Sequence, residues 1–244
     1  MHQVATQVKT VAALGNVALA TSTLLRATNA PEHLPRIVVF SGPSGFGKSY
    51  AASYLSTRYH AYYIECKSTW TRKVVLEQIL RRMGIAAEGT TNSMLEQVCE
   101  QLAVSGRPLI VDEMDYLVDK KAVEIIRDIY EGSQAPIMLI GEELLPKKLK
   151  RWERFHGRIL DWAAAQPADL DDAATLAEFY CHQIPVDDEA VSIIQKRSSG
   201  SVRRICVNLE MAQEEAMKAG HSRITAEFLR ALKLYTGEAP ARRD

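Results

Sequence analysis

The chain has 244 residues, of which 47% are hydrophobic and 25% are charged. This length buries a sizeable core, and it accommodates one large domain or one large and one small domain. The composition is ordinary for a soluble globular protein and excludes collagen-like, coiled-coil and disordered chains. Thirty Lys and Arg residues balance thirty Asp and Glu residues, so any basic surface that binds a polyanion has to be local.

The N-terminal region is predicted to be helical, not a signal peptide. Residues 4–27 show the periodicity of one or two amphipathic helices, and the turn-prone segment NAPEHLP follows them. Polar residues interrupt the apolar run, and no run reaches the roughly 20 apolar residues that span a bilayer. The four cysteines are widely spaced, without a CxxC pair, which indicates buried thiols in a reducing compartment. We therefore expect a cytoplasmic protein with no membrane partner.

Short apolar strands then alternate with longer helical patterns. The predicted strands are residues 37–40, 61–65, 108–113 and 136–141, and a further short strand is ILDW. The predicted helices begin at residue 48 and cover about 69–83, 93–104 and 121–131. Continuous apolar strands separated by helices predict a parallel sheet that is covered on both faces. The predicted fold class is therefore α/β.

The strand signals stop after Pro167. Four helical patterns follow, with acidic starts or a Thr225 cap: LDDAATLAEFYCH, DDEAVSIIQKRS, SVRRICVNLEMAQEEAMKAG and ITAEFLRALKLY. The predicted organisation is an N-terminal helical segment (1–30), an α/β domain (31–167), a small helical domain (168–236) and a tail (237–244).

The stretch GPSGFGKSY lies between the first predicted strand and a helix, and it fits the phosphate-loop pattern GxxxxGK[ST]. Glycines let backbone N–H groups turn toward phosphates, and the helix N-terminus adds partial positive charge. Lys48 is expected to neutralise the β and γ phosphates of ATP, and the Ser49 hydroxyl to bind Mg²⁺. The predicted nucleotide-binding residues of this loop are Gly42, Pro43, Ser44, Gly45, Phe46, Gly47, Lys48, Ser49 and Tyr50.

A second motif, PLIVDEMD, ends the strand at 108–113. Its apolar residues place the Asp112 carboxylate at the C-terminal end of a buried strand, where open α/β sheets bind ligands. Asp112 is expected to hold the Mg²⁺ shell through water, and Glu113 to polarise the attacking water. Asp115 has the alternative role of a helix cap. The DE pair favours ATP hydrolysis over phosphate transfer by a small-molecule kinase. The sequence lacks the NKxD segment that is typical of GTPases.

Together these motifs resemble those of the AAA+ ATPases, which have a phosphate-loop core and a small all-helical lid. The stretch SSGSVRRICVNLEMA resembles their second sensor, so Arg203, or the adjacent Arg204, is expected to reach the γ phosphate. The first sensor is commonly Asn, Ser or Thr at the end of the fourth strand. Here it falls on Gly141 or Glu142, and the resemblance implies a water-positioning role for Glu142.

The resemblance also implies an arginine finger within LPKKLKRWERFHGRILDW. Arg158, directly before the ILDW strand, is preferred over Arg154, and simple surface solvation is the alternative for both. A finger acts on the γ phosphate bound by a neighbouring subunit, so it implies a homo-oligomer whose sites form on assembly.

Within the superfamily, residues 10–236 most resemble the transposition ATPases related to the B protein of phage Mu and to the target-selecting ATPases of Tn7-like elements. The segments that carry this resemblance are LIGEE and RFHGRI. The resemblance implies sequence-nonspecific binding of duplex DNA, ATP-dependent assembly into a helical filament or ring, and recruitment or activation of a transposase. It also implies a bacterial or phage-infected cytoplasm. Because about 30 residues precede the core, DNA contact is expected to fall to the ATPase core.

The segment CKSTWTRKV offers a basic surface for DNA, on which Lys and Arg neutralise phosphates and Thr hydroxyls donate hydrogen bonds. Trp70 is interpreted as a packing residue. The predicted DNA-binding residues are Lys67, Thr69, Thr71, Arg72, Lys73, Lys120 and Lys121. A solvated face is the alternative. A second basic cluster offers a surface for a neighbouring subunit instead of DNA: Lys147, Lys148, Lys150 and Arg151.

Two other functional classes fit the ATPase motifs. One is a secretion or signalling switch that assembles with a protein partner, and the other is a helicase-loader-like ATPase that handles single-stranded DNA.

Overall fold

The computed structural model describes residues 14–238, which divide into two units. Residues 16–166 form an α/β unit, and residues 167–238 form a helical unit that also includes residues 14 and 15. The division between 166 and 167 lies next to the boundary that the sequence predicts. Residues 16–28, however, belong to the α/β unit and do not form a segment apart from it. The predicted helical residues 4–13 lie outside the described residues.

Five parallel strands form the sheet, in the order β2-β3-β4-β1-β5. Their bounds are β1 (Ile37–Ser41), β2 (Tyr62–Glu65), β3 (Leu109–Asp112), β4 (Ile137–Gly141) and β5 (Ile159–Ala164). The predicted α/β fold with a central parallel sheet is confirmed. Because the strands are parallel, all of them end at one edge of the sheet, and the residues that follow β1, β3 and β4 meet there.

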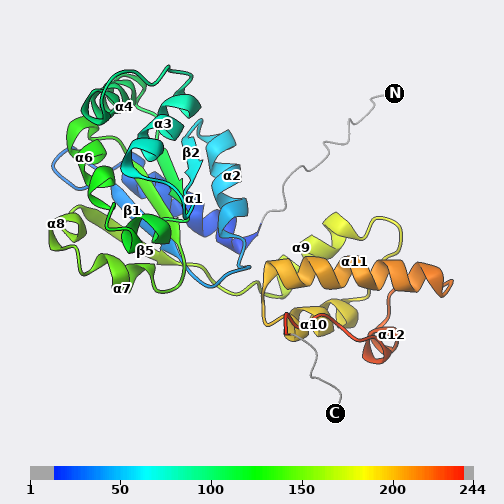
Figure 1. The fold of residues 1–244 in the computed structure, drawn as a ribbon. Coiled ribbons are helices and arrows are strands. Elements are labelled where there is room, and N and C mark those ends of the chain that lie inside the picture. Colours follow the sequence, from blue (N-terminus) through cyan, green and yellow to red (C-terminus); the bar gives the residue numbers. More distant parts are fainter. Residues whose placement is uncertain (1–13, 239–244) are drawn as a thin grey trace, which may run out of the picture. The chain divides into compact units, whose positions relative to one another are not determined.

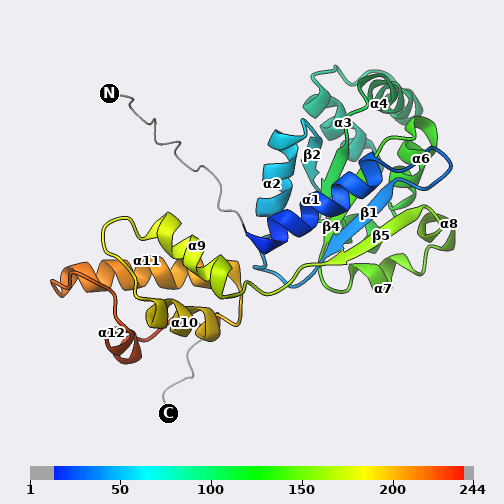
Figure 2. The same cartoon turned by 180° about the vertical axis from the view of Figure 1, so that it is seen from behind.

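Helices cover both faces of the sheet. The helices of this unit are α1 (Gly15–Thr28), α2 (Lys48–Arg58), α3 (Arg72–Met83), α4 (Thr91–Ser105), α5 (Asp115–Asp119), α6 (Glu124–Ser133), α7 (Leu145–Leu149) and α8 (Glu153–His156). Figure 2 shows α1 lying across one face of the sheet, and Figure 1 shows α3, α4 and α6 gathered on the other side. The apolar side of α1 explains its place, because Leu24 and Ala27 are completely buried.

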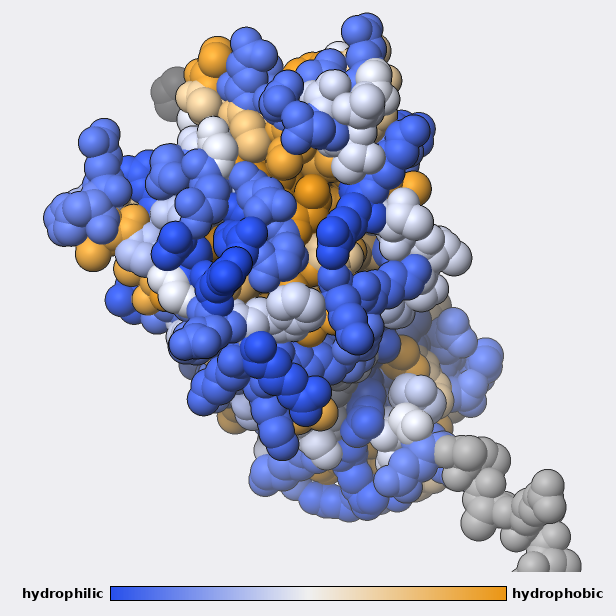
Figure 3. All heavy atoms as spheres, turned by 60° about the vertical axis from the view of Figure 1, so that its left-hand side comes forward, coloured by the Kyte–Doolittle hydropathy of each residue, from blue (hydrophilic) through white to orange (hydrophobic). Residues whose placement is uncertain are grey.

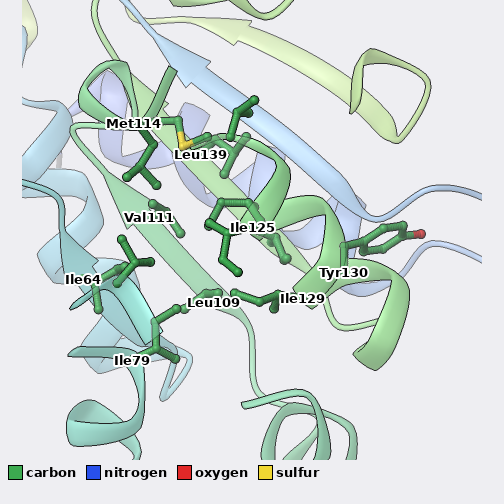
Figure 4. Packing of buried hydrophobic residues seen from close by; sticks show 14 of the residues in the cluster. Ile64, Ile79, Leu109, Val111, Met114, Ile125, Ile129, Tyr130 and Leu139 are labelled. Atoms are coloured by element: carbon green, nitrogen blue, oxygen red, sulfur yellow. The ribbon is translucent and has the colours of Figure 1, made fainter. Parts of the chain in front are cut away.

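The larger part of the core lies between the sheet and α3, α4 and α6. Alternate strand residues such as Ile64, Val111 and Leu139 point to this side, as the pleat of a strand requires. Figure 4 shows them meeting Ile79 of α3 and Ile129 of α6. Each fully buried aliphatic side chain of this kind contributes about 1.5–3 kcal/mol. This packing gives the functional edge of the sheet a rigid support.

Capping residues account for the differences between predicted and observed helix bounds. Helix α3 begins at Arg72, not at residue 69, because the Thr71 hydroxyl accepts a hydrogen bond from the Val74 N–H. Helix α4 begins earlier than predicted, after the Thr90 cap. The single helix predicted for 121–131 is wrong at its start. Lys121 has a φ of +55°, and it separates α5 from α6.

The helical unit contains the four helices that the sequence predicts, α9 (Leu170–Tyr180), α10 (Asp188–Arg197), α11 (Val202–Lys218) and α12 (Ala226–Ala231). Completely buried Asn208 fastens the segment after α12 to α11. Its amide donates to the Ser198 hydroxyl and the Tyr235 carbonyl, both at 3.0 Å, and its oxygen accepts the Tyr235 N–H at 2.7 Å. The chain end is thereby held against the helices as far as Tyr235.

Polar side chains cover most of the face drawn in Figure 3, with apolar residues visible between them. No helix within residues 14–238 has the length and apolar character needed to cross a membrane. All four cysteines are free thiols, and Cys66 and Cys181 are buried whereas Cys99 and Cys206 are partly buried. Burial raises the pKa of the Cys66 thiol to about 12, so this thiol stays protonated at neutral pH.

Candidate nucleotide-binding site

The loop between β1 and α2 has the conformation that its glycines permit. Gly45 and Gly47 adopt the left-handed φ values of +86° and +82°. A Cβ atom added to Gly42 would lie 2.8 Å from the Cβ of Ala165. Glycine is therefore favoured at these positions, and Gly47 directly precedes the first residue of α2. The loop surrounds the N-terminus of this helix, which is a favourable place for an anion.

The Lys48 ammonium group folds back onto its own loop. Its Nζ donates hydrogen bonds to the carbonyl oxygens of Gly42 at 2.7 Å and Pro43 at 2.9 Å. Burial lowers the pKa of Lys48, and the nearby carboxylates of Asp112 and Glu113 oppose this effect. The sequence-predicted lysine and acidic pair are therefore close enough to interact. Ser49 lies in the first turn of α2 and is exposed.

Asp112 is held in a fixed orientation at the end of β3. It is 1% exposed, and its Oδ2 accepts a hydrogen bond from the Tyr63 hydroxyl at 3.1 Å. Its Oδ1 accepts the N–H of Glu113 at 2.8 Å. Burial and the Asp112 charge raise the pKa of Tyr63, so the phenol remains a donor. Sequence reasoning missed Tyr63, because its role depends on the pairing of β2 with β3.

Glu113 adopts a backbone conformation that is unusual for a residue with a side chain. Its φ is +55°, in the left-handed region, and such conformations cost about 1–3 kcal/mol and cluster at functional sites. Burial and the charge of Asp112 raise the pKa of Glu113, whereas the charge of Lys48 lowers it. A carboxyl group with a raised pKa is suited to exchanging a proton with water.

Asp115 connects two strand ends and is not simply a helix cap. Its Oδ2 accepts the Glu142 N–H at 2.7 Å, and its Oδ1 lies 3.1 Å from Nζ of Lys148. A Cβ atom on Gly141 would lie 2.4 Å from Asp115 Oδ2. The end of β4 therefore carries no side chain, and a carboxylate from α5 lies against it.

The first-sensor candidates differ in what they offer. Gly141 has no side chain, and the Glu142 side chain is exposed although its charge acts on the pKa of Lys48. A water-positioning role for Glu142 stays a prediction. Lys148 also lies 2.9 Å from Asp119, so its charge is neutralised within the chain. A contact of this lysine with a neighbouring subunit stays a prediction.

The two arginine-finger candidates lie at the other edge of the sheet. Arg158 directly precedes β5, and the start of a parallel strand is opposite the edge where the phosphate loop lies. Its Nε is 2.6 Å from the Glu131 carboxylate, and its side chain is 45% exposed. Arg154 and Arg158 line a surface hollow of about 450 Å³ together with Arg127, Asp128 and Glu131. Neither arginine is therefore brought to the phosphate loop of its own chain.

The second-sensor candidate Arg203 lies in the first turn of α11 and is exposed. Sterics explain why a glycine precedes this helix. Gly200 has a φ of +65°, and a Cβ atom added there would lie 2.5 Å from the Cβ of Pro167. Arg204 points instead toward the chain end, where its guanidinium lies near Gly237. Because Arg203 belongs to the helical unit, its contact with a phosphate stays a prediction.

The two parts of the predicted DNA surface lie together. Arg72 Nη2 donates to the Lys121 carbonyl at 3.0 Å, and Lys120 Nζ donates to the Trp70 carbonyl at 3.3 Å. These bonds join the segment after β2 to the turn after α5. Trp70 is partly buried against the core, which confirms its interpretation as a packing residue.

Most of the remaining residues of the predicted DNA surface have partners within the chain. Lys67 pairs with Glu65, and this hydrogen bond raises the pKa of the lysine. Lys73 lies 3.8 Å from Glu77. The Thr71 hydroxyl caps α3, so it is less available as a donor to phosphate than the sequence suggests, whereas Thr69 is exposed.

The strand order and the position of the loop identify the fold. A parallel sheet with β4 between the phosphate-loop strand and the acidic strand, with helices on both faces, is the fold of the P-loop AAA+ ATPases. Residues 32–149 match the family model of the AAA domain. No curated protein sequence matches the chain.

Solved structures with this fold include Cdc6p from Pyrobaculum aerophilum, which is 13% identical with a TM-score of 0.60. The alignment covers 88% of this chain and 64% of Cdc6p. The Holliday junction branch migration motor RuvB from Thermotoga maritima is 18% identical with a TM-score of 0.60, over 89% of this chain and 68% of RuvB. The chain thus spans about two thirds of the length of these proteins. At these identities the likeness shows the fold alone.

Proposed function

We propose that this chain binds ATP with Mg²⁺ and hydrolyses it. The observation that carries the proposal is the convergence of Lys48, Asp112 and Glu113 at the edge of the sheet where the glycine loop meets α2. These residues fit the ligand. The loop presents backbone N–H groups and one lysine to phosphate oxygens, and an exposed hydroxyl and an oriented carboxylate supply the oxygen donors that Mg²⁺ prefers.

Each group has a distinct task in the proposed reaction. Lys48 exchanges the carbonyl oxygens of its own loop for phosphate oxygens. Ser49 and Asp112 would hold Mg²⁺, and the bound ion would neutralise charge on the phosphates. Tyr63 keeps Asp112 in the orientation for this role. Glu113 orients the attacking water and accepts its proton as the new P–O bond forms and the bond from the γ phosphorus to the β-phosphate oxygen breaks, which releases ADP.

The proposed active form is a homo-oligomer. Arg158 lies at the edge of the sheet opposite its own phosphate loop, so it can act only on a nucleotide held by a neighbouring subunit. There its guanidinium would stabilise charge on the γ phosphate. This action requires Arg158 to leave Glu131, its partner in the isolated chain. Arg154, on the same hollow, is the alternative finger.

The proposed ligand of the assembled ATPase is duplex DNA, bound without sequence preference. The joined basic surface supports this proposal, because two segments that are far apart in sequence present their cations together. The sequence resemblance to the transposition ATPases extends it to assembly as a filament, in the cytoplasm, that recruits or activates a transposase. Hydrolysis would then set how long the protein stays on DNA.

The test of DNA binding is ATP turnover with and without duplex DNA at several salt concentrations. We expect duplex DNA to stimulate ATP turnover, and we expect this stimulation to decrease as the salt concentration rises. Replacing Lys120 and Lys121 by Ala should weaken DNA binding and reduce the salt slope by about one for each phosphate contact that is lost. The matched control replaces Lys147 and Lys150, which are exposed lysines outside this surface. Equal losses in the two double variants would contradict the assignment of the surface, and unchanged wild-type turnover with no DNA retention would refute DNA binding.

The test of the shared active site mixes two inactive variants. Arg158→Ala should hydrolyse ATP poorly alone and recover when it is mixed with Lys48→Ala, because each variant supplies the group that its neighbour lacks. Glu113→Gln should bind ATP without turnover. Absence of recovery in the mixture would count against a finger that acts between subunits.

A further inference from the structure

Asn16 is a buried polar residue at the start of α1 that joins two distant parts of the α/β unit. Its side-chain amide donates to the carbonyl of Phe46, in the phosphate loop, at 2.8 Å. The same amide donates to the Gln166 carbonyl at 2.7 Å, and the Asn16 Oδ1 accepts the Gln166 N–H at 2.9 Å. Asn16 is only 4% exposed. One side chain thus holds the loop and both backbone groups of residue 166.

Residue 166 is the last residue of the α/β unit, and the chain enters the helical unit at Pro167. The preceding residue is bound at the start of the phosphate loop, where β1 ends. The Ala165 N–H donates to the Ser41 carbonyl at 2.7 Å, and Gly42 has no room for a side chain because Ala165 lies so close. The segment 165–166 is therefore bound to both ends of the loop, directly through Ser41 and indirectly through Asn16.

The contacts of Asn16 are more specific than those of an ordinary core residue. An apolar side chain would fill a buried position on α1 without needing a partner, whereas a buried amide costs free energy unless it is hydrogen-bonded. Asn16 satisfies its amide only when the Phe46 carbonyl and the Gln166 backbone keep their present relative positions. A shift of the loop therefore breaks a bond or moves residue 166 with it.

We propose that Asn16 is a positioning residue that transmits the nucleotide state of the phosphate loop to the connection between the α/β unit and the helical unit. The proposal rests on the proposed nucleotide binding. When phosphate displaces Lys48 from the Gly42 and Pro43 carbonyls, the loop adjusts, and the Phe46 carbonyl transmits this change through Asn16 to Gln166. The helical unit then starts from a backbone whose position depends on the ligand.

The test measures amide hydrogen exchange at residues 41–47 and 164–168, with and without the magnesium complex of a nonhydrolysable ATP analogue. The variants are Asn16→Leu, which removes all three bonds, and Asn16→Asp, which keeps the size and the acceptor but loses both donors. The matched control is Thr23→Val on the same helix. Thr23 is equally buried, and its hydroxyl bonds only to the Leu19 carbonyl one turn earlier.

We expect nucleotide to slow exchange at both segments in the wild type and in Thr23→Val. In both Asn16 variants the loop should still respond, with about fivefold weaker nucleotide binding for one lost hydrogen bond, while the response at 164–168 falls at least threefold. Without nucleotide, the Gln166 amide should exchange faster in Asn16→Leu while the Ala165 amide keeps its protection. A general loss of stability would raise exchange at both amides, which separates it from the predicted effect.

The outcomes distinguish the two proposals. If the wild type binds nucleotide and the Asn16 variants keep the full response at 164–168, the role of Asn16 is refuted and the proposed function stands. A wild-type chain that binds no nucleotide refutes both.

Discussion

The Asp115 carboxylate offers a quantitative test of how the ends of β3 and β4 are connected. Asp115→Ala removes the acceptor of the Glu142 N–H, which lies at 2.7 Å, and the ion pair with Lys148. An N–H left without a partner costs about 1–2 kcal/mol. The ion pair adds less than about 1 kcal/mol, because Lys148 is partly exposed and keeps Asp119 as its partner. We expect the unfolding free energy to fall by about 2 kcal/mol.

Urea unfolding followed by tryptophan fluorescence measures this loss of stability in the α/β unit, because all three tryptophans lie within residues 16–166. With an m value of about 2 kcal/mol per M, the midpoint should fall by about 1 M. Asp115→Asn keeps an acceptor for the Glu142 N–H and should lose about half as much. The control Asp119→Ala removes a 58% exposed side chain and should lose less than about 0.5 kcal/mol. Equal midpoints for Asp115→Ala and Asp119→Ala would refute the connection.

Three further predictions concern the same edge of the sheet. Tyr63→Phe should raise the Mg²⁺ concentration for half-maximal turnover about tenfold, because Asp112 loses its orienting donor; an unchanged magnesium titration would contradict this role. Gly141→Ala should destabilise the α/β unit by about 1–3 kcal/mol, measured in the same urea assay, because its Cβ meets Asp115; wild-type stability would contradict the close packing. Turnover should fall on acidification at a higher pH than the ordinary pKa of a glutamate implies, since Glu113 must be ionised and its pKa is raised; a rate profile that stays flat to about pH 5 would count against it.

The local motifs of the sequence were sufficient to predict the strands, the phosphate loop and the acidic strand end. Each of these depends on a short stretch whose residue pattern has one structural solution, as in the glycines around Lys48. What the sequence did not reveal are contacts between distant residues. Asn16 bonds to Gln166 across 150 positions, and Tyr63 to Asp112 across 49. Such pairs depend on strand order and helix placement, which no periodicity encodes.

The linear pattern also does not show where a side chain already has a partner within the chain. Lys148 reads as one cation of an exposed basic cluster, but Asp115 and Asp119 neutralise it. Thr71 reads as a polar contact residue, but it caps α3. In both cases a neighbour in space takes the group that the linear pattern leaves available.

The charge balance around Lys48 has a consequence for which form of nucleotide can enter. Four carboxylates act on the pKa of this one ammonium group, those of Asp112, Glu113, Glu142 and Asp115. Lys148 is a second cation near this edge, but it is already paired. These carboxylates repel a highly charged anion that arrives without a counterion, and they thereby oppose the attraction of the α2 N-terminus. The proposed nucleotide would therefore enter more readily as its magnesium complex than without the metal.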